Sequence, residues 1–181
     1  MRPLTVAVTG GMGAGKSEAL KAFARRGIPT LSADDVVHHL IADDPEVRVA
    51  LEDRFGTTDR GEIAAVVFAD PDELAWLESL LHPRVRRVTD EWLGGLDAEV
   101  AVTEIPLLYE TGGEDRFDAV VVITAPDDVR AARSARVRDT RSRRLIPDEA
   151  KVARADFAYV NEGTLDDLDA FVGRVLERLR A

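Results

Sequence analysis

The feature that most constrains how this chain folds is a glycine-rich run from Gly10 to Ser17, which reads G-G-M-G-A-G-K-S. An apolar, β-rich segment over 4–9 precedes it, and a segment over 17–26 with apolar residues at helical spacing follows it, closed by Gly27. The pattern G-x-x-x-x-G-K-[ST] between a strand and a helix is typical of a phosphate-binding loop, in which backbone N–H groups and the start of a helix surround phosphate oxygens. The sequence therefore predicts a nucleotide site.

Individual side chains of this run have separate expected roles. Lys16 is expected to reach the β- and γ-phosphates of ATP and to act in catalysis, and the Ser17 hydroxyl is expected to ligate Mg²⁺. Glu18 stands in the first turn of the expected helix, where an acidic side chain is favourable. The predicted nucleotide-binding residues are Gly11, Met12, Gly13, Ala14, Gly15, Lys16, Ser17 and Glu18.

Further Val- and Ile-rich segments predict the rest of the fold. Strands are expected over 28–32, 100–105, 119–123 and 157–160, whereas 34–93 carries helical patterns only, divided by Pro45, Gly56, Pro71 and Pro83. Near-continuous apolar strands separated by helices indicate a parallel sheet covered on both faces. We predict an α/β fold of the P-loop NTPase type, with five parallel strands, a core over about 1–34 and 95–181, a helical insertion over about 35–93 and a short lid over about 130–147.

The last helix has clear boundaries in the sequence. Thr164 is expected to cap it, with Asp167 three residues on. One apolar face is expected to pack on the sheet, formed by Leu165, Leu168, Phe171, Val172, Val175 and Leu179.

Composition excludes several classes of protein. The 181 residues include no cysteine, so disulfides, thiolate metal sites and a cysteine nucleophile are excluded. The net charge of −10 argues against a nucleic-acid binder. No apolar run approaches the roughly 20 residues of a membrane-spanning helix, and the first residues read as a strand rather than a secretory signal. We expect a cytoplasmic monomer.

A phosphate-binding loop alone does not separate kinases from GTPases. The chain lacks an N-K-x-D motif, and the D-x-x-G match at 53–56 lies in the helical stretch rather than after a strand. A small-molecule kinase and a non-catalytic ATP-binding sensor remain. Asp34 follows the second strand at the carboxyl edge of the sheet, where a carboxylate can accept a hydroxyl proton. The alternative is that Asp34 caps a helix beginning at Asp35 or Val36.

Seven arginines between 130 and 144 form the second cationic feature of the sequence. Guanidinium groups suit phosphate oxygens, although such a run is also typical of a solvated helix face. We select Arg133, Arg136 and Arg138 as candidate catalytic contacts to phosphate.

Histidine and tryptophan suggest no further chemistry. The adjacent His38 and His39 point about 100° apart on a helix, so they cannot share a metal, and at least one is expected to pack. His82 is expected to end a helix before Pro83, and Trp76 and Trp92 read as core or interface.

Several segments together resemble the dephospho-CoA kinase family over nearly the full chain. They are the loop opening at Val8, Ala33-Asp34, Val67-Phe68-Ala69-Asp70 with Leu77-Glu78 and His82-Pro83, Ile105-Pro106-Leu107-Leu108-Tyr109-Glu110, and Ala155-Asp156-Phe157 with Asn161-Glu162-Gly163. The resemblance implies ATP-dependent phosphorylation of the ribose 3′-hydroxyl of dephospho-CoA. Ser32 replaces an aspartate of that family, Leu145 stands where glutamine is expected, and the chain between Pro126 and Pro147 is several residues short.

The resemblance also implies roles for individual residues. Asp34 would be the base, Lys16 the phosphate clamp, and Asn161 a further nucleotide contact. Glu104 either holds a Mg²⁺-bound water or is a solvated acid at the end of a strand. The helical insertion would bind the acceptor, and the substrate-binding residues would be Thr9, Asp34, His82, Pro83, Arg84 and Leu107.

Overall fold

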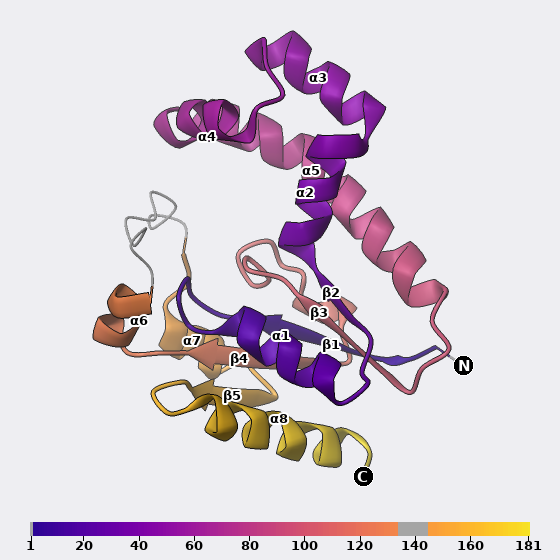
Figure 1. Cartoon of the computed structure of the whole chain (residues 1–181), viewed down its shortest axis with the longest axis vertical. Coiled ribbons are helices and arrows are strands. Elements are labelled where there is room, and N and C mark those ends of the chain that lie inside the picture. The colour runs from indigo at the N-terminus through magenta and orange to yellow at the C-terminus, as the bar shows by residue number, and fades with distance from the viewer. Residues whose placement is uncertain (1, 134–144) are drawn as a thin grey trace. The chain divides into compact units, whose positions relative to one another are not determined.

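The computed structural model describes residues 2–133 and 145–181 and forms two compact units (Figure 1). The first unit comprises Met1–Ser32 and Leu96–Ala181, and the second comprises Ala33–Gly95. In chain order the elements are β1 (Leu4–Thr9), α1 (Lys16–Arg25), β2 (Thr30–Ser32), α2 (Ala33–Asp43), α3 (Pro45–Phe55), α4 (Arg60–Ala69), α5 (Pro71–Gly94), β3 (Val100–Glu104), the 3₁₀ turn η1 (Glu114–Arg116), β4 (Ala119–Thr124), α6 (Asp127–Arg133), α7 (Asp148–Val152), β5 (Phe157–Val160) and α8 (Leu165–Leu179).

The first unit is built on a parallel sheet of five strands in the order β2-β3-β1-β4-β5, which confirms the predicted fold class. β1 is central: Leu4 pairs with Val100 of β3, and Val6 pairs with Ala119 of β4. All carboxyl ends of a parallel sheet lie at one edge, so the Gly10 loop leaves the sheet at the middle of that edge.

Apolar side chains cover both faces of the sheet. On one face α1 and α8 lie side by side, and Phe23 and Leu168 are buried against Val6, Val8 and Val121 (Figure 1). On the other face Ala7, Val120 and Val122 pack with Leu108, Tyr109, Phe117 and Ile146. This face is therefore covered by the segment that follows β3 and by the chain that leads into α7.

The C-terminal helix largely follows its sequence pattern. The Thr164 side chain accepts a hydrogen bond from the Asp167 N–H, and the Asp167 carboxylate accepts one from the Thr164 N–H, which confirms the expected cap. The prediction that Leu165 belongs to the buried face of this helix is wrong, because Leu165 is 62% exposed, whereas Leu176, which was not predicted, is buried. Leu165 is the first helical residue beside the cap and lies before the turns that contact the sheet.

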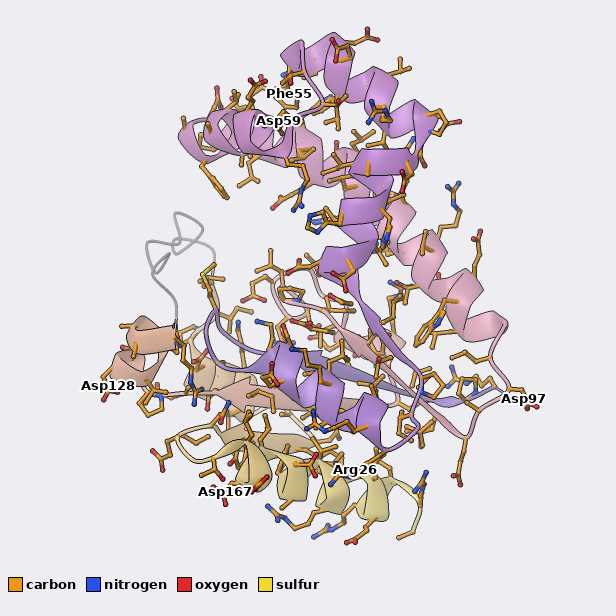
Figure 2. All side chains as sticks on the ribbon, viewed as in Figure 1. Arg26, Phe55, Asp59, Asp97, Asp128 and Asp167 are labelled. Carbon is orange, nitrogen blue, oxygen red and sulfur yellow. The ribbon has the colours of Figure 1, made fainter. Side chains whose placement is uncertain are left out.

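The second unit consists of α2 to α5. Asp44 and Asp59 cap α3 and α4 by accepting hydrogen bonds from backbone N–H groups of the first turns. Figure 2 shows Phe55 and Asp59 on either side of the turn between these helices. Gly56 ends α3 at φ +69°, so the D-x-x-G match at 53–56 is the end of a helix, which confirms that it lies in the helical stretch and does not follow a strand.

The prediction that Pro83 ends a helix after His82 is wrong, because α5 runs without interruption from Pro71 to Gly94. Proline removes one helical hydrogen bond, at a cost of about 3 kcal/mol. α5 packs against both α2 and α4, and these contacts stabilise the helix despite the proline.

The histidine and aromatic side chains of the second unit differ in their exposure. His38 and His39 are both exposed, so the expected packing of one of them is wrong. Trp76 is half-buried and meets Phe55 edge to face at 5.4 Å between ring centroids, as expected of a packing residue.

Among the described residues, no helix has the length and apolar content needed to cross a bilayer.

Candidate nucleotide-binding site

The loop between β1 and α1 has a backbone that requires glycine. Gly10, Gly13 and Gly15 have φ angles of +145°, +75° and +101°, which residues with a Cβ rarely adopt. A Cβ on Gly10 would also overlap the carbonyl oxygen of Ile123 on β4. The glycines therefore let the loop turn tightly over the sheet edge, leaving backbone N–H groups available to an anion at the start of α1.

Lys16, Ser17 and Glu18 form the first turn of α1. The Lys16 ammonium donates a hydrogen bond to the Gly11 carbonyl at 3.2 Å, so it lies over the loop. Ser17 is exposed. The Glu18 carboxylate instead accepts from Lys21 at 2.7 Å along the helix surface, and its expected nucleotide contact stays a prediction.

The ends of β1 and β3 lie beside the loop. Thr9 is fully buried, and its hydroxyl donates to the Pro106 carbonyl at 3.4 Å. Glu104 pairs in register with Val8 on one side and Ser32 on the other, and only 4% of its surface is exposed. A solvated acid is therefore excluded for Glu104. Leu107 is half-buried in the segment that follows.

Asn161 connects the end of β5 to the same loop. Its amide nitrogen donates to the Ala14 carbonyl at 2.8 Å, and its own N–H donates to the Thr124 carbonyl at 2.7 Å. A Cβ on Gly15 would overlap the Asn161 amide. Asn161 is 5% exposed, so its side chain stabilises the loop through a buried hydrogen bond. The sequence motif pointed to Asn161 but not to this stabilising role.

The arginine-rich segment is described only in part. Arg133, at the end of α6, donates to the Asn161 carbonyl oxygen at 3.2 Å, which puts it at this edge of the sheet. The candidates Arg136 and Arg138 lie outside the described residues. Arg130, which the sequence analysis did not select, pairs with Asp148 of α7 at 2.8 Å and lies against the loop at Gly11. Because seven arginines fall within 130–144, no sequence signal distinguishes Arg130 from the others.

A buried ion pair holds α7 to the segment after β3. Lys151 and Glu110 are 2.7 Å apart, with side chains 2% and 7% exposed. The same Glu110 oxygen accepts the Ile146 N–H at 3.2 Å. Burial raises the pKa of the adjacent Tyr109 phenol, partly offset by the Arg154 guanidinium, which lies 4.5 Å from the ring centroid. The sequence analysis missed this pair, because lysine and glutamate are usually exposed.

Four of the candidate acceptor residues, Asp34, His82, Pro83 and Arg84, belong to the second unit. Asp34 is exposed and lies in the first turn of α2, which begins at Ala33, so Asp34 is not the N-cap of a later helix. His82 and Arg84 are half-buried on α5, and Pro83 between them is exposed. Arg84 donates to the Leu80 carbonyl at 2.9 Å and to Glu46 at 3.1 Å.

Among the described residues, no three His, Asp or Glu side chains form a metal site by themselves.

Comparison with curated sequences gives relatives of similar length. A profile of the family described as Dephospho-CoA kinase matches residues 4–167. A dephospho-CoA kinase of Brucella melitensis is 34% identical, covering 97% of this chain and 95% of that protein. One of Rhodopseudomonas palustris is 36% identical, covering 96% and 94%.

Solved structures agree with the fold. A protein of Thermus thermophilus superimposes with a TM-score of 0.83 at 33% identity, covering 99% of both chains. A dephospho-CoA kinase from Campylobacter jejuni gives a TM-score of 0.71 at 22% identity, covering 98% of this chain and 97% of that one. The latter likeness concerns the fold alone.

Proposed function

The chain belongs to the dephospho-CoA kinase family, and we propose that it transfers the γ-phosphate of ATP to the ribose 3′-hydroxyl of dephospho-CoA, giving coenzyme A and ADP. The observation that carries this proposal is the glycine loop at the central strand, with Gly10, Gly13 and Gly15 at positive φ and Lys16 over the loop. Such a cradle fits a triphosphate, because it offers N–H donors, a helix start and an ammonium group together.

Lys16 and the loop hold the phosphates in this proposal. Lys16 exchanges its bond to the Gly11 carbonyl for phosphate oxygens, where its charge stabilises the charge that develops in the transition state. Asn161 keeps the loop in place through Ala14. Arg133, already at this edge, adds a guanidinium, with Arg136 and Arg138 as further candidates.

Mg²⁺ has a donor set that suits it here. The hydroxyl of Ser17 would be a direct ligand, and the buried carboxylate of Glu104 would hold a water of its hydration shell; both are oxygen donors, as Mg²⁺ prefers. When bound, the ion neutralises charge on the β- and γ-phosphates.

Asp34 is proposed as the base that accepts the proton of the 3′-hydroxyl. It follows Ser32, the last residue of β2, by only two positions, and its carboxylate is exposed. Thr9, Leu107 and the α5 residues His82, Pro83 and Arg84 are proposed to contact the acceptor. We further propose that the enzyme acts in the cytoplasm as a monomer without a nucleic-acid partner, and light scattering after gel filtration tests the monomeric state.

The experiment couples ADP release to oxidation of NADH, with ATP and Mg²⁺, with and without dephospho-CoA, and detects coenzyme A by mass. The proposal expects ADP release that depends on the acceptor and equals the coenzyme A formed. ATP binding without coenzyme A formation would reject this acceptor in favour of another hydroxyl compound or a sensor.

The role of Asp34 is tested with a neighbouring control. Asp34→Asn is expected to lower kcat about 10²- to 10⁴-fold, the usual contribution of a general base, with the Kd for ATP unchanged. Asp35→Asn removes the adjacent first-turn acid of the same helix and is expected to retain activity within about threefold, since helix-end charges contribute at most about 1 kcal/mol. Equal losses in both variants would mean that Asp34 acts through the helix.

A further inference from the structure

Arg130 makes an extensive contact with the glycine loop. An ideal Cβ on Gly11 would lie 3.0 Å from Nη1, 3.1 Å from Cζ and 3.4 Å from Nη2 of Arg130. A Cβ on Gly13 would lie 3.1 Å from the Arg130 carbonyl oxygen. The guanidinium thus lies against Gly11, and a side chain there would require it to move, while the Arg130 backbone lies against Gly13, whose φ of +75° also favours glycine.

An acidic partner orients this guanidinium. Arg130 Nη1 donates to Asp148 Oδ2 at 2.8 Å, and the two side chains are 24% and 29% exposed. A second carboxylate, Asp127, is 3.9 Å away but 99% exposed, so it contributes little. Asp148 therefore supplies the principal restraint on Arg130.

Asp148 is itself on a fixed element. It is the first residue of α7, and Lys151 of the same helix forms the buried ion pair with Glu110. Glu110 also accepts the Ile146 N–H just before the helix. The residue that pairs with Glu110 and the residue that pairs with Arg130 thus lie on the same short helix.

We propose that Arg130 is a positioning residue for ATP: it holds Gly11 to Gly13 in the phosphate-binding conformation, places a positive charge next to the loop, and is oriented by Asp148. The inference rests on the proposed function only in that ATP is the ligand. On a chain with a net charge of −10, a cation fixed beside the loop also offsets the repulsion of an incoming triphosphate.

The test measures ATP binding by calorimetry, which needs no acceptor, together with KM and kcat for both substrates. Arg130→Met keeps much of the apolar stem and is expected to raise the Kd and KM for ATP about tenfold, leaving the KM for dephospho-CoA unchanged. Asp148→Asn releases the guanidinium and also removes one negative charge near the loop; the loss of orientation is expected to predominate and to raise them about threefold. Arg130→Lys is expected to restore part of the affinity, because it restores the charge.

Salt dependence separates charge from packing. The wild-type Kd for ATP should rise more steeply between about 0.05 and 0.5 M salt than that of Arg130→Met, because the variant has lost one cation near the phosphates.

Arg26→Met is the matched control. Arg26 is 28% exposed and pairs with Asp169 at 2.6 Å between α1 and α8 (Figure 2), away from the loop. The Arg26→Met substitution should lower the melting temperature without changing the Kd for ATP.

The proposal would be overturned if Arg130→Met bound ATP within twofold of wild type. It would also be overturned if affinity, both KM values and the melting temperature changed in parallel, as in a structural defect. A wild-type protein that binds ATP but makes no coenzyme A would reject the acceptor while leaving this test valid.

Discussion

Replacing Lys151 by methionine tests how much the buried ion pair contributes to the first unit. The pair is 2.7 Å long, with its side chains 2% and 7% exposed, so removal of the ammonium leaves the Glu110 carboxylate buried without a counter-charge. Among the described residues, the second Glu110 oxygen already has no hydrogen-bond partner. Breaking a buried pair in this way costs about 3–5 kcal/mol. Since each kcal/mol lowers the melting temperature of a protein of this size by roughly 2–4 °C, Lys151→Met should melt roughly 6–20 °C lower.

Two further variants make the reasoning falsifiable. Glu110→Gln with Lys151→Met removes the uncompensated charge but keeps an acceptor for the Ile146 N–H, so it should recover most of the loss. Lys21→Met breaks an ion pair of the same 2.7 Å length whose side chains are 65% and 39% exposed, and should change the free energy of unfolding by at most about 1 kcal/mol. Urea unfolding followed by circular dichroism measures all three. A cost below about 1 kcal/mol for Lys151→Met, or no recovery in the double variant, would refute the argument.

Two other predictions concern the loop and the pH dependence of stability. Gly10→Ala should lose ATP binding and at least about 1–3 kcal/mol of stability in calorimetry, because φ is +145° and the new Cβ would overlap the Ile123 carbonyl. The control is Gly94→Ala at the end of α5. This position has open space around it, so the variant should not lose stability. Hydrogen bonds from Arg26, then Arg25, lower the pKa of Asp169 from 3.8 to about 2. Its stabilising contribution is therefore complete above about pH 4 and is lost as the pH falls towards 2, so the melting-temperature difference between wild type and Asp169→Asn should shrink over that range; a constant difference would contradict the assignment.

Local sequence patterns predicted the parts of the fold that local chemistry determines. The Val- and Ile-rich strands and the glycine loop carry their own signals, because a buried parallel strand needs apolar residues on both faces and a positive φ needs glycine. The Thr164 cap could also be predicted from the sequence, since both of its hydrogen bonds join residues three positions apart.

The remaining contacts depend on pairing between distant segments. Glu110 and Lys151 are 41 positions apart, and nothing near either residue indicates that both are buried. Arg130 lies in a run of similar arginines, and only the fold selects it by placing α6 against Gly13. Pro83 lies inside α5 because a helix-breaking tendency of a few kcal/mol is overridden by the packing of this helix against α2 and α4.

The position of β1 in the sheet has a consequence for synthesis on the ribosome. Val6 is fully buried, yet its neighbour Ala119 on β4 is made 113 residues later, and Val100 of β3 pairs with Leu4 across 96 residues. At typical elongation rates of 5–20 residues per second, β1 waits about 6–23 s for its second partner. The helices of residues 33–95 emerge meanwhile, and the contacts of α2 with α3 and α5, and of α4 with α5, join elements that are all made before β3. The insertion can therefore fold first, while an apolar strand remains exposed to chaperones until β4 is complete.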